Sequence, residues 1–179
     1  MSKTVLAICT GPHQGGNSET LTDAFLDGAR EVGHSVEKIC LYDKTIGFCK
    51  GCLVCQETQR CVICDDADWI AQKMKDVDVL VFATPIYYYE MCGQMKTMLD
   101  RANPLFPSDY RFREVYLIAT AAEYEQSAMD RAVSGLEGWV ECFEKARLAG
   151  TVFGGGAETL DAMKNSPALQ RARDMGRKV

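Results

Sequence analysis

This sequence lacks three features: an excess of positive charge, a long apolar run near the amino end, and internal repeats. The 20 lysines and arginines are outnumbered by 25 aspartates and glutamates, which gives a net charge of −5. Without a basic patch, the chain is not expected to bind nucleic acid or anionic lipid. Residues 1–9 form a short run with one lysine and no cleavage site, so we expect neither a signal peptide nor a membrane span. These absences predict a cytoplasmic protein.

Two common phosphate-binding motifs are also missing from the glycine-containing loop at residues 10–18. A dinucleotide fingerprint requires Gly-x-Gly-x-x-Gly and a Walker A loop requires Gly-Lys-Ser/Thr, whereas this loop reads Thr-Gly-Pro-His-Gln-Gly-Gly-Asn-Ser. The loop nevertheless joins an apolar run to a helical pattern, so its amides and the helix dipole can converge on a phosphate. The side chains of Thr10, Asn17 and Ser18 can add donors. Alternatively, Asn17 or Ser18 merely caps the helix while the glycines form a turn.

Strand-like and helical segments alternate along the 179 residues, which form one domain able to bury about 70% of its unfolded surface. Apolar runs predict five strands at 4–9, 35–41, 77–84, 114–120 and 148–153. Helical spacing predicts helices at 18–32, 67–75, 93–101, 126–147 and 158–177, the last interrupted at Pro167. This order favours an α/β domain with a flavodoxin-like, doubly wound five-stranded parallel sheet and helices on both faces. Its ligand crevice would lie at the carboxyl ends of the strands.

Nine cysteines are present, and five of them fall within residues 49–64 at the spacing Cys-x2-Cys-x2-Cys-x5-Cys-x2-Cys. An odd number of cysteines in a reducing compartment favours metal ligands or buried thiols over a disulfide framework. Thiolates at these short spacings can converge on one point and hold a metal or an iron–sulfur cluster. They belong to an irregular insertion at about residues 42–66, which is longer than ordinary connections in compact domains.

Two further loops are expected to line the crevice. Residues 84–93 carry three consecutive tyrosines, of which one or two can cover a planar ligand while another packs inward. A tyrosine patch used for subunit packing is the alternative, and both roles can coexist. Residues 120–125 contain no glycine, and no general acid or base stands out in either loop.

Short motifs in these loops carry a resemblance to a known family. The sequences Gly-Pro-His-Gln-Gly-Gly-Asn-Ser at 11–18, Thr-Pro-Ile-Tyr at 84–87 and Gly-Gln-Met-Lys…Asp-Arg at 93–101 resemble the flavodoxin-like NAD(P)H-dependent FMN reductase superfamily over most of the chain. With four cysteines at 49–61 followed by Asp65-Asp66, the sequence looks most like the iron–sulfur flavoprotein branch. Lys96, Asp100 and Arg101 are expected to be structural or interfacial.

The resemblance implies an FMN site built from the three loops. The first loop would hold the phosphate, the second would hold the isoalloxazine ring, and the third would cover the other edge of the ring. The expected cofactor-binding residues are Thr10, His13, Gly15, Gly16, Asn17, Ser18, Thr84, Pro85, Ile86, Tyr87, Tyr88, Thr120, Ala121 and Glu123.

Two positions depart from the pattern of the superfamily. Gly11-Pro12-His13 stands where Ser-Pro-Arg is common, and Ala121-Ala122 stands where glycines are common. The first change removes a hydroxyl and a fixed positive charge from the phosphate site, so FMN could bind more weakly, with His13 as a partial replacement.

The cysteine cluster admits three interpretations. Its resemblance to iron–sulfur flavoproteins assigns Cys49, Cys52, Cys55 and Cys61 to a [4Fe–4S] cluster and leaves Cys64 spare. Two knuckles, Cys52-x2-Cys55 and Cys61-x2-Cys64, could instead hold structural zinc, although the gap between them is shorter than usual. The third interpretation is a set of reduced thiols without metal. Cys92 has no assigned role.

The expected function is that of an enzyme, an FMN-dependent oxidoreductase. It would pass electrons from NAD(P)H or a ferredoxin-like carrier to a small acceptor such as a quinone or free flavin, with FMN as the converter and an iron–sulfur cluster as a further carrier. The alternative is a non-enzymatic electron carrier or a metal-regulated flavin-binding module. The resemblance also implies a homodimer or homotetramer.

Overall fold

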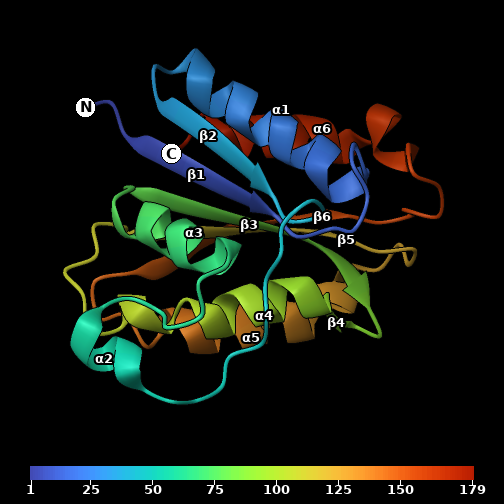
Figure 1. Cartoon of the computed structure of the whole chain (residues 1–179). Helices are drawn as coiled ribbons and strands as arrows, with labels where there is room; N and C mark the ends of the chain where they lie inside the picture. Colours follow the sequence, from blue (N-terminus) through green and yellow to red (C-terminus); the bar gives the residue numbers. More distant parts are fainter.

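The computed structural model describes residues 1–179, and its centre is a parallel sheet of strand order β2-β1-β3-β5-β6 (Figure 1). Its strands are β1 (Thr4–Cys9), β2 (Ser35–Cys40), β3 (Val79–Tyr87), β5 (Glu114–Thr120) and β6 (Arg147–Gly154). The three central strands β1, β3 and β5 are buried almost throughout because helices cover both faces. The predicted flavodoxin-like fold is confirmed. The structure adds a sixth strand, β4 (Glu90–Met91), which pairs antiparallel with the end of β3 and is too short to give a sequence pattern.

The helices form two layers, one on each face of the sheet (Figure 1). One layer contains α1 (Asn17–Glu31) and α6 (Pro167–Gly176), and the other contains α3 (Asp66–Lys75), α4 (Gly93–Arg101) and α5 (Asp130–Val140). Shorter elements are α2 (Val54–Thr58) and the 3-10 turns η1 (Asn103–Leu105), η2 (Gln126–Met129) and η3 (Ala162–Asn165). None of these helices is both long and apolar enough to cross a membrane.

Two predicted helices are shorter than expected. The helix predicted for 126–147 ends at Val140, because Phe143 turns inward against Trp139 at a ring distance of 4.6 Å and the chain then enters β6. The helix predicted for 158–177 begins only at Pro167. There the Ser166 hydroxyl accepts the amide of Ala168, and proline at the first helical position favours a start.

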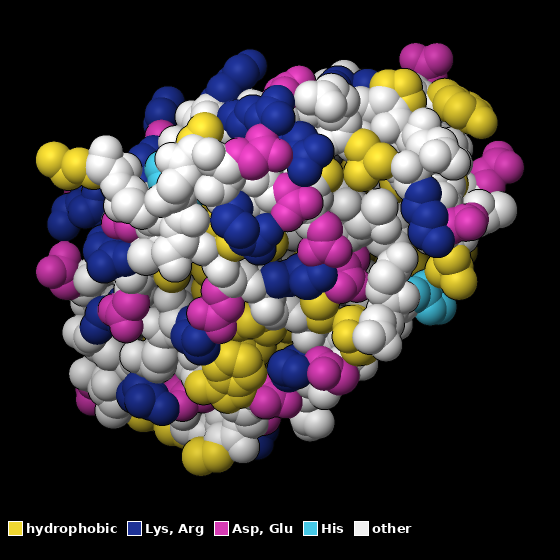
Figure 2. Space-filling model, turned by 90° about the horizontal axis from the view of Figure 1, so that it is seen from above, with side chains coloured by type: hydrophobic (Ala, Val, Ile, Leu, Met, Phe, Trp, Pro, Cys, Tyr) yellow, Lys and Arg dark blue, Asp and Glu magenta, His cyan; other side chains and the backbone are white.

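Two glycines let α1 and α6 approach until their backbones touch. A Cβ at Gly28 would lie 2.0 Å from the carbonyl oxygen of Arg173, and one at Gly176 would lie 1.9 Å from that of Phe25. Ion pairs from Glu31 to Arg173 and Arg177 border the contact. Figure 2 shows that basic and acidic side chains are interspersed over this face, which therefore offers no basic patch.

Candidate functional site

A cavity of about 530 Å³ lies at the carboxyl ends of β1, β3, β5 and β6. Doubly wound folds bind ligands at this edge of the sheet, and the volume lies within the range of small-molecule pockets. The structure thus brings the three predicted loops together. Eleven of the fourteen residues predicted to hold FMN line the cavity: His13, Gly16, Asn17, Ser18, Pro85, Ile86, Tyr87, Tyr88, Thr120, Ala121 and Glu123.

The first loop enters α1 without a side-chain cap. Gly16 occupies the cap position, and no side chain accepts a hydrogen bond there. The Asn17 side chain is used elsewhere, because its Nδ2 donates to the Thr159 carbonyl at 2.6 Å and its Oδ1 accepts the Met163 amide at 3.0 Å. The capping alternative for Asn17 or Ser18 is therefore wrong. The uncapped first turn borders the cavity, where its amides are available to an anion.

Gly15 shapes this loop from outside the cavity lining. Its φ of +66° lies in the left-handed region that favours glycine, and its amide donates to Glu19 Oε2 at 2.7 Å. No lysine or arginine lines the cavity, and His13 is the single basic side chain among the lining residues. A phosphate here would depend on amides and hydroxyls.

Thr10 and Thr84, both predicted to meet the ligand, are instead fully buried and absent from the cavity lining. The Thr10 hydroxyl donates to the Ala83 carbonyl at 2.8 Å and contacts the Cys92 sulfur at 3.2 Å. The Thr84 hydroxyl accepts the Cys92 amide at 3.0 Å and donates to the Pro85 carbonyl at 2.9 Å. The Cys92 thiol also donates to the Thr10 carbonyl. These bonds join the first loop to the strand ends, which gives Cys92 a structural role.

The tyrosine segment forms a β-hairpin and not an extended loop. Tyr87 is the last residue of β3 and pairs with Glu90 of β4. Tyr88 and Tyr89 make the turn with φ of +53° and +64°, a region that residues other than glycine rarely occupy. Tyr88 is 96% exposed. Partial burial raises the pKa of Tyr87, whose ring belongs to the cavity wall.

A fourth wall, missed in the sequence, comes from residues 157–160 after β6. Close glycine contacts hold it against the third loop: a Cβ at Gly155 would lie 2.8 Å from the Glu123 carbonyl, and one at Gly156 would lie 2.7 Å from the Tyr124 ring. The Gly-Gly-Gly sequence at 154–156, directly at the carboxyl end of a strand, was the available signal. The helix predicted for residues 158–177 covered most of this wall, so the sequence did not indicate a ligand-facing loop there.

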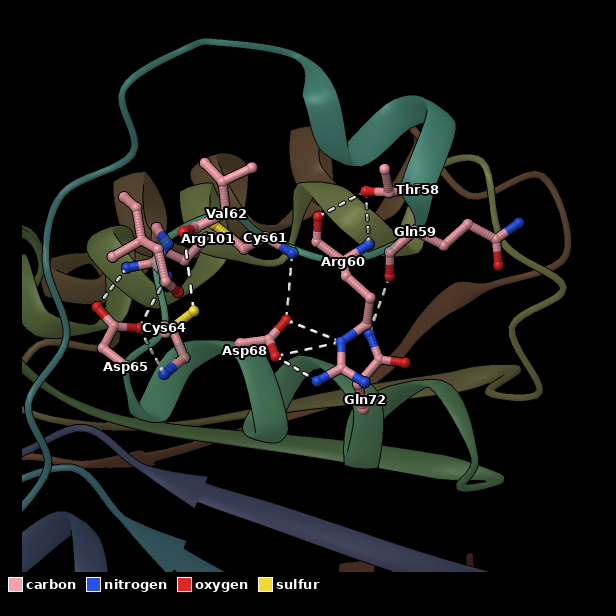
Figure 3. A network of polar contacts seen from close by, with 12 residues as sticks. Thr58, Gln59, Arg60, Cys61, Val62, Cys64, Asp65, Asp68, Gln72 and Arg101 are labelled. Carbon is pink, nitrogen blue, oxygen red and sulfur yellow. Dashed lines mark hydrogen bonds and ion pairs between the residues drawn. The ribbon is translucent and has the colours of Figure 1, made fainter.

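The cysteine insertion runs from the end of β2 past α4 to α3 (Figure 1), and a buried arginine holds it. Arg101 of α4 donates to both carboxylate oxygens of Asp65, at 2.7 and 2.8 Å. It also donates to the carbonyls of Gly47 at 2.7 Å and Ile63 at 3.1 Å. Burial alone would raise the pKa of Asp65, but the bonds from Arg101 and the Gly47 amide hold it below its usual value. Because the same guanidinium bonds Gly47 and Ile63, this clamp joins two distant parts of the insertion. Figure 3 shows Asp65 and Arg101.

A second clamp holds the middle of the insertion against α3 (Figure 3). Asp68 pairs with the Arg60 guanidinium and accepts the Cys61 amide at 3.1 Å. Gln72 Nε2 donates to the Gln59 carbonyl at 3.0 Å. The segment is therefore fixed mainly by polar contacts.

The other charged residues of the α4 motif lie at the surface. Lys96 and Asp100 form an exposed ion pair at 2.7 Å with i,i+4 spacing. Such pairs contribute about 0.2–0.5 kcal/mol to a helix. Among the three charged residues of the motif, Arg101 thus has the dominant structural role.

The thiols of the insertion differ in exposure: Cys55 is buried, Cys61 is partly exposed, and Cys49, Cys52 and Cys64 are exposed. No three histidine, cysteine, aspartate or glutamate side chains lie close enough together to hold a metal ion. The donor chemistry fits an iron–sulfur cluster, which thiolates ligate. The spatial arrangement, by contrast, is not that of an assembled site.

Comparison with known proteins gives a consistent family relationship. The sequence profile described as NADPH-dependent FMN reductase matches residues 4–160. An iron–sulfur flavoprotein of Methanocaldococcus jannaschii is 37% identical over 101 residues, which are 56% of this chain and 52% of that protein. An iron–sulfur flavoprotein of Methanosarcina thermophila is 22% identical over 98% of this chain and 92% of that protein. The chain spans about half the length of the first relative in this alignment.

Solved structures share the fold at low sequence identity. An NAD(P)H:quinone oxidoreductase from Methanothermobacter marburgensis has a TM-score of 0.76 and 17% identity, with 99% of this chain and 96% of that chain covered. The azoreductase AzrA has a TM-score of 0.73 and 16% identity, with 98% and 100% covered.

Proposed function

Because this chain belongs to the NADPH-dependent FMN reductase family, we propose that it is an oxidoreductase whose FMN occupies the cavity at the carboxyl ends of the strands. The observation that carries this placement is the uncapped first turn of α1, which borders the same cavity as the tyrosine hairpin. One part of the cavity therefore suits an anionic group and another suits a planar ring.

The residues of the chain bind and orient the cofactor. We place the phosphate at the first turn of α1, where backbone amides and the Ser18 hydroxyl can donate. We place the isoalloxazine between the tyrosine hairpin and the third loop at residues 120–123. Bound FMN supplies the conversion between two-electron and one-electron transfer.

We propose NAD(P)H or a ferredoxin-like carrier as the electron donor and a small aromatic molecule, such as a quinone or free flavin, as the acceptor. The names of the structural neighbours, a quinone oxidoreductase and an azoreductase, support aromatic acceptors. The exposed Tyr88 ring can extend the apolar surface that such a molecule would contact. We further propose a homodimer or homotetramer.

Titration with FMN, followed by steady-state oxidation of NADH and NADPH with a quinone, tests this function. We expect one FMN per chain and turnover with at least one nucleotide. Saturable FMN binding without turnover would favour the non-enzymatic carrier. A lack of saturable FMN binding would contradict the placement itself.

Replacing Tyr87 with alanine is expected to weaken FMN binding about fivefold, or about 1 kcal/mol, because an aromatic contact with the ring is lost. Fluorescence titration of FMN measures the change. Tyr42→Ala, which alters a tyrosine outside the cavity lining, is the matched control. If separate alanine replacements of Tyr87, Tyr88 and Tyr89 all leave the affinity unchanged, the tyrosines serve packing alone.

Replacing Asn17 with alanine is expected to weaken FMN binding about tenfold, because the fourth wall loses its bonds at Thr159 and Met163. Asn165→Ala provides the control, since Asn165 is exposed and lies outside the cavity lining. Equal affinities of the two variants for FMN would show that this tether does not shape the site.

We also propose that Cys49, Cys52, Cys55 and Cys61 hold an iron–sulfur cluster, as the names of the sequence relatives suggest. Anaerobic reconstitution with ferrous iron and sulfide tests this assignment. Serine replacement of any of the four is expected to abolish cluster absorbance, whereas Cys64→Ser is expected to retain it. Binding of one zinc per chain without iron uptake would overturn the cluster.

A further inference from the structure

Two cysteines outside the insertion face each other across neighbouring strands. Cys9 ends β1 and Cys40 ends β2, and the two residues are partners in the register of the parallel sheet. Both thiols are free, and both side chains pack against the apolar cluster beneath α1 and α6. Adjacent strands lie about 4.7–4.9 Å apart, and a disulfide joins Cα atoms that are about 4.4–6.8 Å apart. The two backbones are therefore already at a distance that a disulfide can span.

The two thiols differ in access and in environment. Cys9 is 3% exposed, whereas Cys40 is partly exposed at the end of β2, an edge strand of the sheet. Cys40 donates to Glu19 Oε1 at 3.4 Å, and the same oxygen accepts Lys38 Nζ at 2.8 Å. Interaction with Cys9 lowers the pKa of Cys40, and interaction with Cys40 raises the pKa of Cys9. Because oxidants react with accessible thiolates, Cys40 is suited to react first and Cys9 to resolve the product.

Both cysteines are connected to the first loop, where we place the FMN phosphate. Thr10, which opens the loop, directly follows Cys9. Glu19, which accepts from Cys40, also accepts the Gly15 amide of the loop through its other oxygen at 2.7 Å. A disulfide requires Cβ atoms about 3.5–4.5 Å apart, which is closer than the normal spacing of strands. Its formation would draw the ends of β1 and β2 together and shift the loop that follows.

We infer that Cys9 and Cys40 are a redox modification site, at which hydrogen peroxide forms a reversible disulfide that weakens FMN binding. The Cys40 thiolate attacks one peroxide oxygen, the O–O bond breaks, and a sulfenic acid forms with release of hydroxide. The Cys9 thiol then attacks the Cys40 sulfur, so that an S–S bond forms and the sulfenic oxygen leaves as water. The two sulfurs lose one electron pair, which reduces the peroxide. Small thiols reverse the bond, because strained disulfides are the labile ones.

Trypsin allows a direct test in the full chain, because residues 4–30 form a peptide with Cys9 as its one cysteine and residues 39–44 form a peptide with Cys40 alone. Reduced protein is treated with hydrogen peroxide, alkylated, digested and analysed by mass spectrometry. We expect the two peptides to be linked, and dithiothreitol to separate them. Cys142→Ser is the matched control: it removes an exposed thiol just beyond α5 and should leave the link intact.

Single serine variants separate the roles of the two thiols. In Cys9→Ser, we expect a sulfenic acid at Cys40 that dimedone traps, because no thiol is left to resolve it. In Cys40→Ser, we expect Cys9 to remain a thiol, because it is buried. The inference would be overturned if peroxide left the two wild-type peptides separate, or if it linked them to the exposed cysteines of the insertion as often as to each other.

Fluorescence titration with FMN tests the functional consequence, which rests on the proposed flavin site, whereas the disulfide does not. We expect linked wild type to bind FMN about fivefold more weakly than reduced wild type, equivalent to the loss of one hydrogen bond. Cys40→Ser should show no change after the same treatment. Equal affinities of linked and reduced wild type would overturn the effect on the flavin loop. Lack of FMN binding in both forms would overturn the flavin site and leave the disulfide standing.

Discussion

Replacing Arg101 with methionine is expected to lower the free energy of unfolding by about 3–5 kcal/mol, because it leaves a largely buried carboxylate without its partner. The Arg101 side chain is fully buried and that of Asp65 is 11% exposed. The substitution also removes donors from the carbonyls of Gly47 and Ile63. Urea denaturation followed by circular dichroism measures the loss.

The matched control for this substitution is Lys96→Met on the same helix. Its ion pair with Asp100 is exposed, with 62% of the lysine side chain accessible, so the expected change is about 0.5 kcal/mol or less. Asp65→Asn and the double variant complete a cycle that isolates the coupling between Arg101 and Asp65. A loss below about 1 kcal/mol in Arg101→Met would show that the insertion is anchored by other contacts.

Replacing Gly28 with alanine is expected to destabilise the protein by about 3 kcal/mol or more, at the upper end of the range for overpacking. The added Cβ would lie 2.0 Å from the carbonyl oxygen of Arg173, which is backbone and cannot move aside as a side chain could. The helices α1 and α6 would have to separate, exposing the apolar cluster beneath them. Thermal denaturation provides the measurement.

Gly138→Ala is the control for a helical glycine without a packing role. Gly138 lies in α5 with no heavy atom within 4 Å of the added Cβ, so alanine should stabilise the helix by up to about 1 kcal/mol. We therefore expect Gly28→Ala to lower the stability of the protein and Gly138→Ala to raise it. A similar effect of both substitutions would mean that the contact between α1 and α6 adjusts freely.

The sequence carried enough information to predict the parallel sheet and the end at which a ligand site forms. Runs such as Val79–Ala83 and Val115–Ala119 are apolar without alternation because helices cover both faces of the strands. The connections that follow such strands meet at one edge whatever their composition. Residues as distant as Ser18, Tyr87 and Glu123 could therefore be assigned to one site from order alone.

The direction in which a polar side chain points, and the group to which it is hydrogen-bonded, could not be predicted in the same way. The hydroxyl of Thr10 has the right chemistry for a phosphate and that of Thr84 for a flavin ring, but local backbone geometry turns them toward Ala83 and Cys92. Likewise, Arg101 lies 36 residues from Asp65 in sequence, and no periodic pattern connects them. Tertiary contacts of this kind decide which polar groups are free, and a single sequence does not contain their geometry.

The spacing of the cysteines shows the same limit. Gaps of two residues permit neighbouring thiols to approach one centre, but they do not determine where the remainder of the loop is held. In the structure, the clamps at Asp65 and Asp68 hold the insertion at Gly47 and along residues 59–65, whereas Cys49 and Cys52 between these points are at the surface. The assignment of Cys49, Cys52, Cys55 and Cys61 as ligands stays a prediction, and their spacing did not predict the arrangement of the thiols that the structure shows.

At Tyr88 and Tyr89, which form a left-handed turn, the residue that would make the fold most stable differs from the residue that would contact a ligand best. A residue with a Cβ in this conformation costs roughly 1–2 kcal/mol compared with a relaxed backbone, a penalty that glycine avoids. Replacing either tyrosine with glycine would therefore relieve this backbone strain and raise heat resistance. The same substitution would remove an aromatic ring from the cavity wall. A more heat-resistant variant of the hairpin would thus have a more open cavity. Mutational screens that select for stability alone should first replace the tyrosines at the cavity mouth.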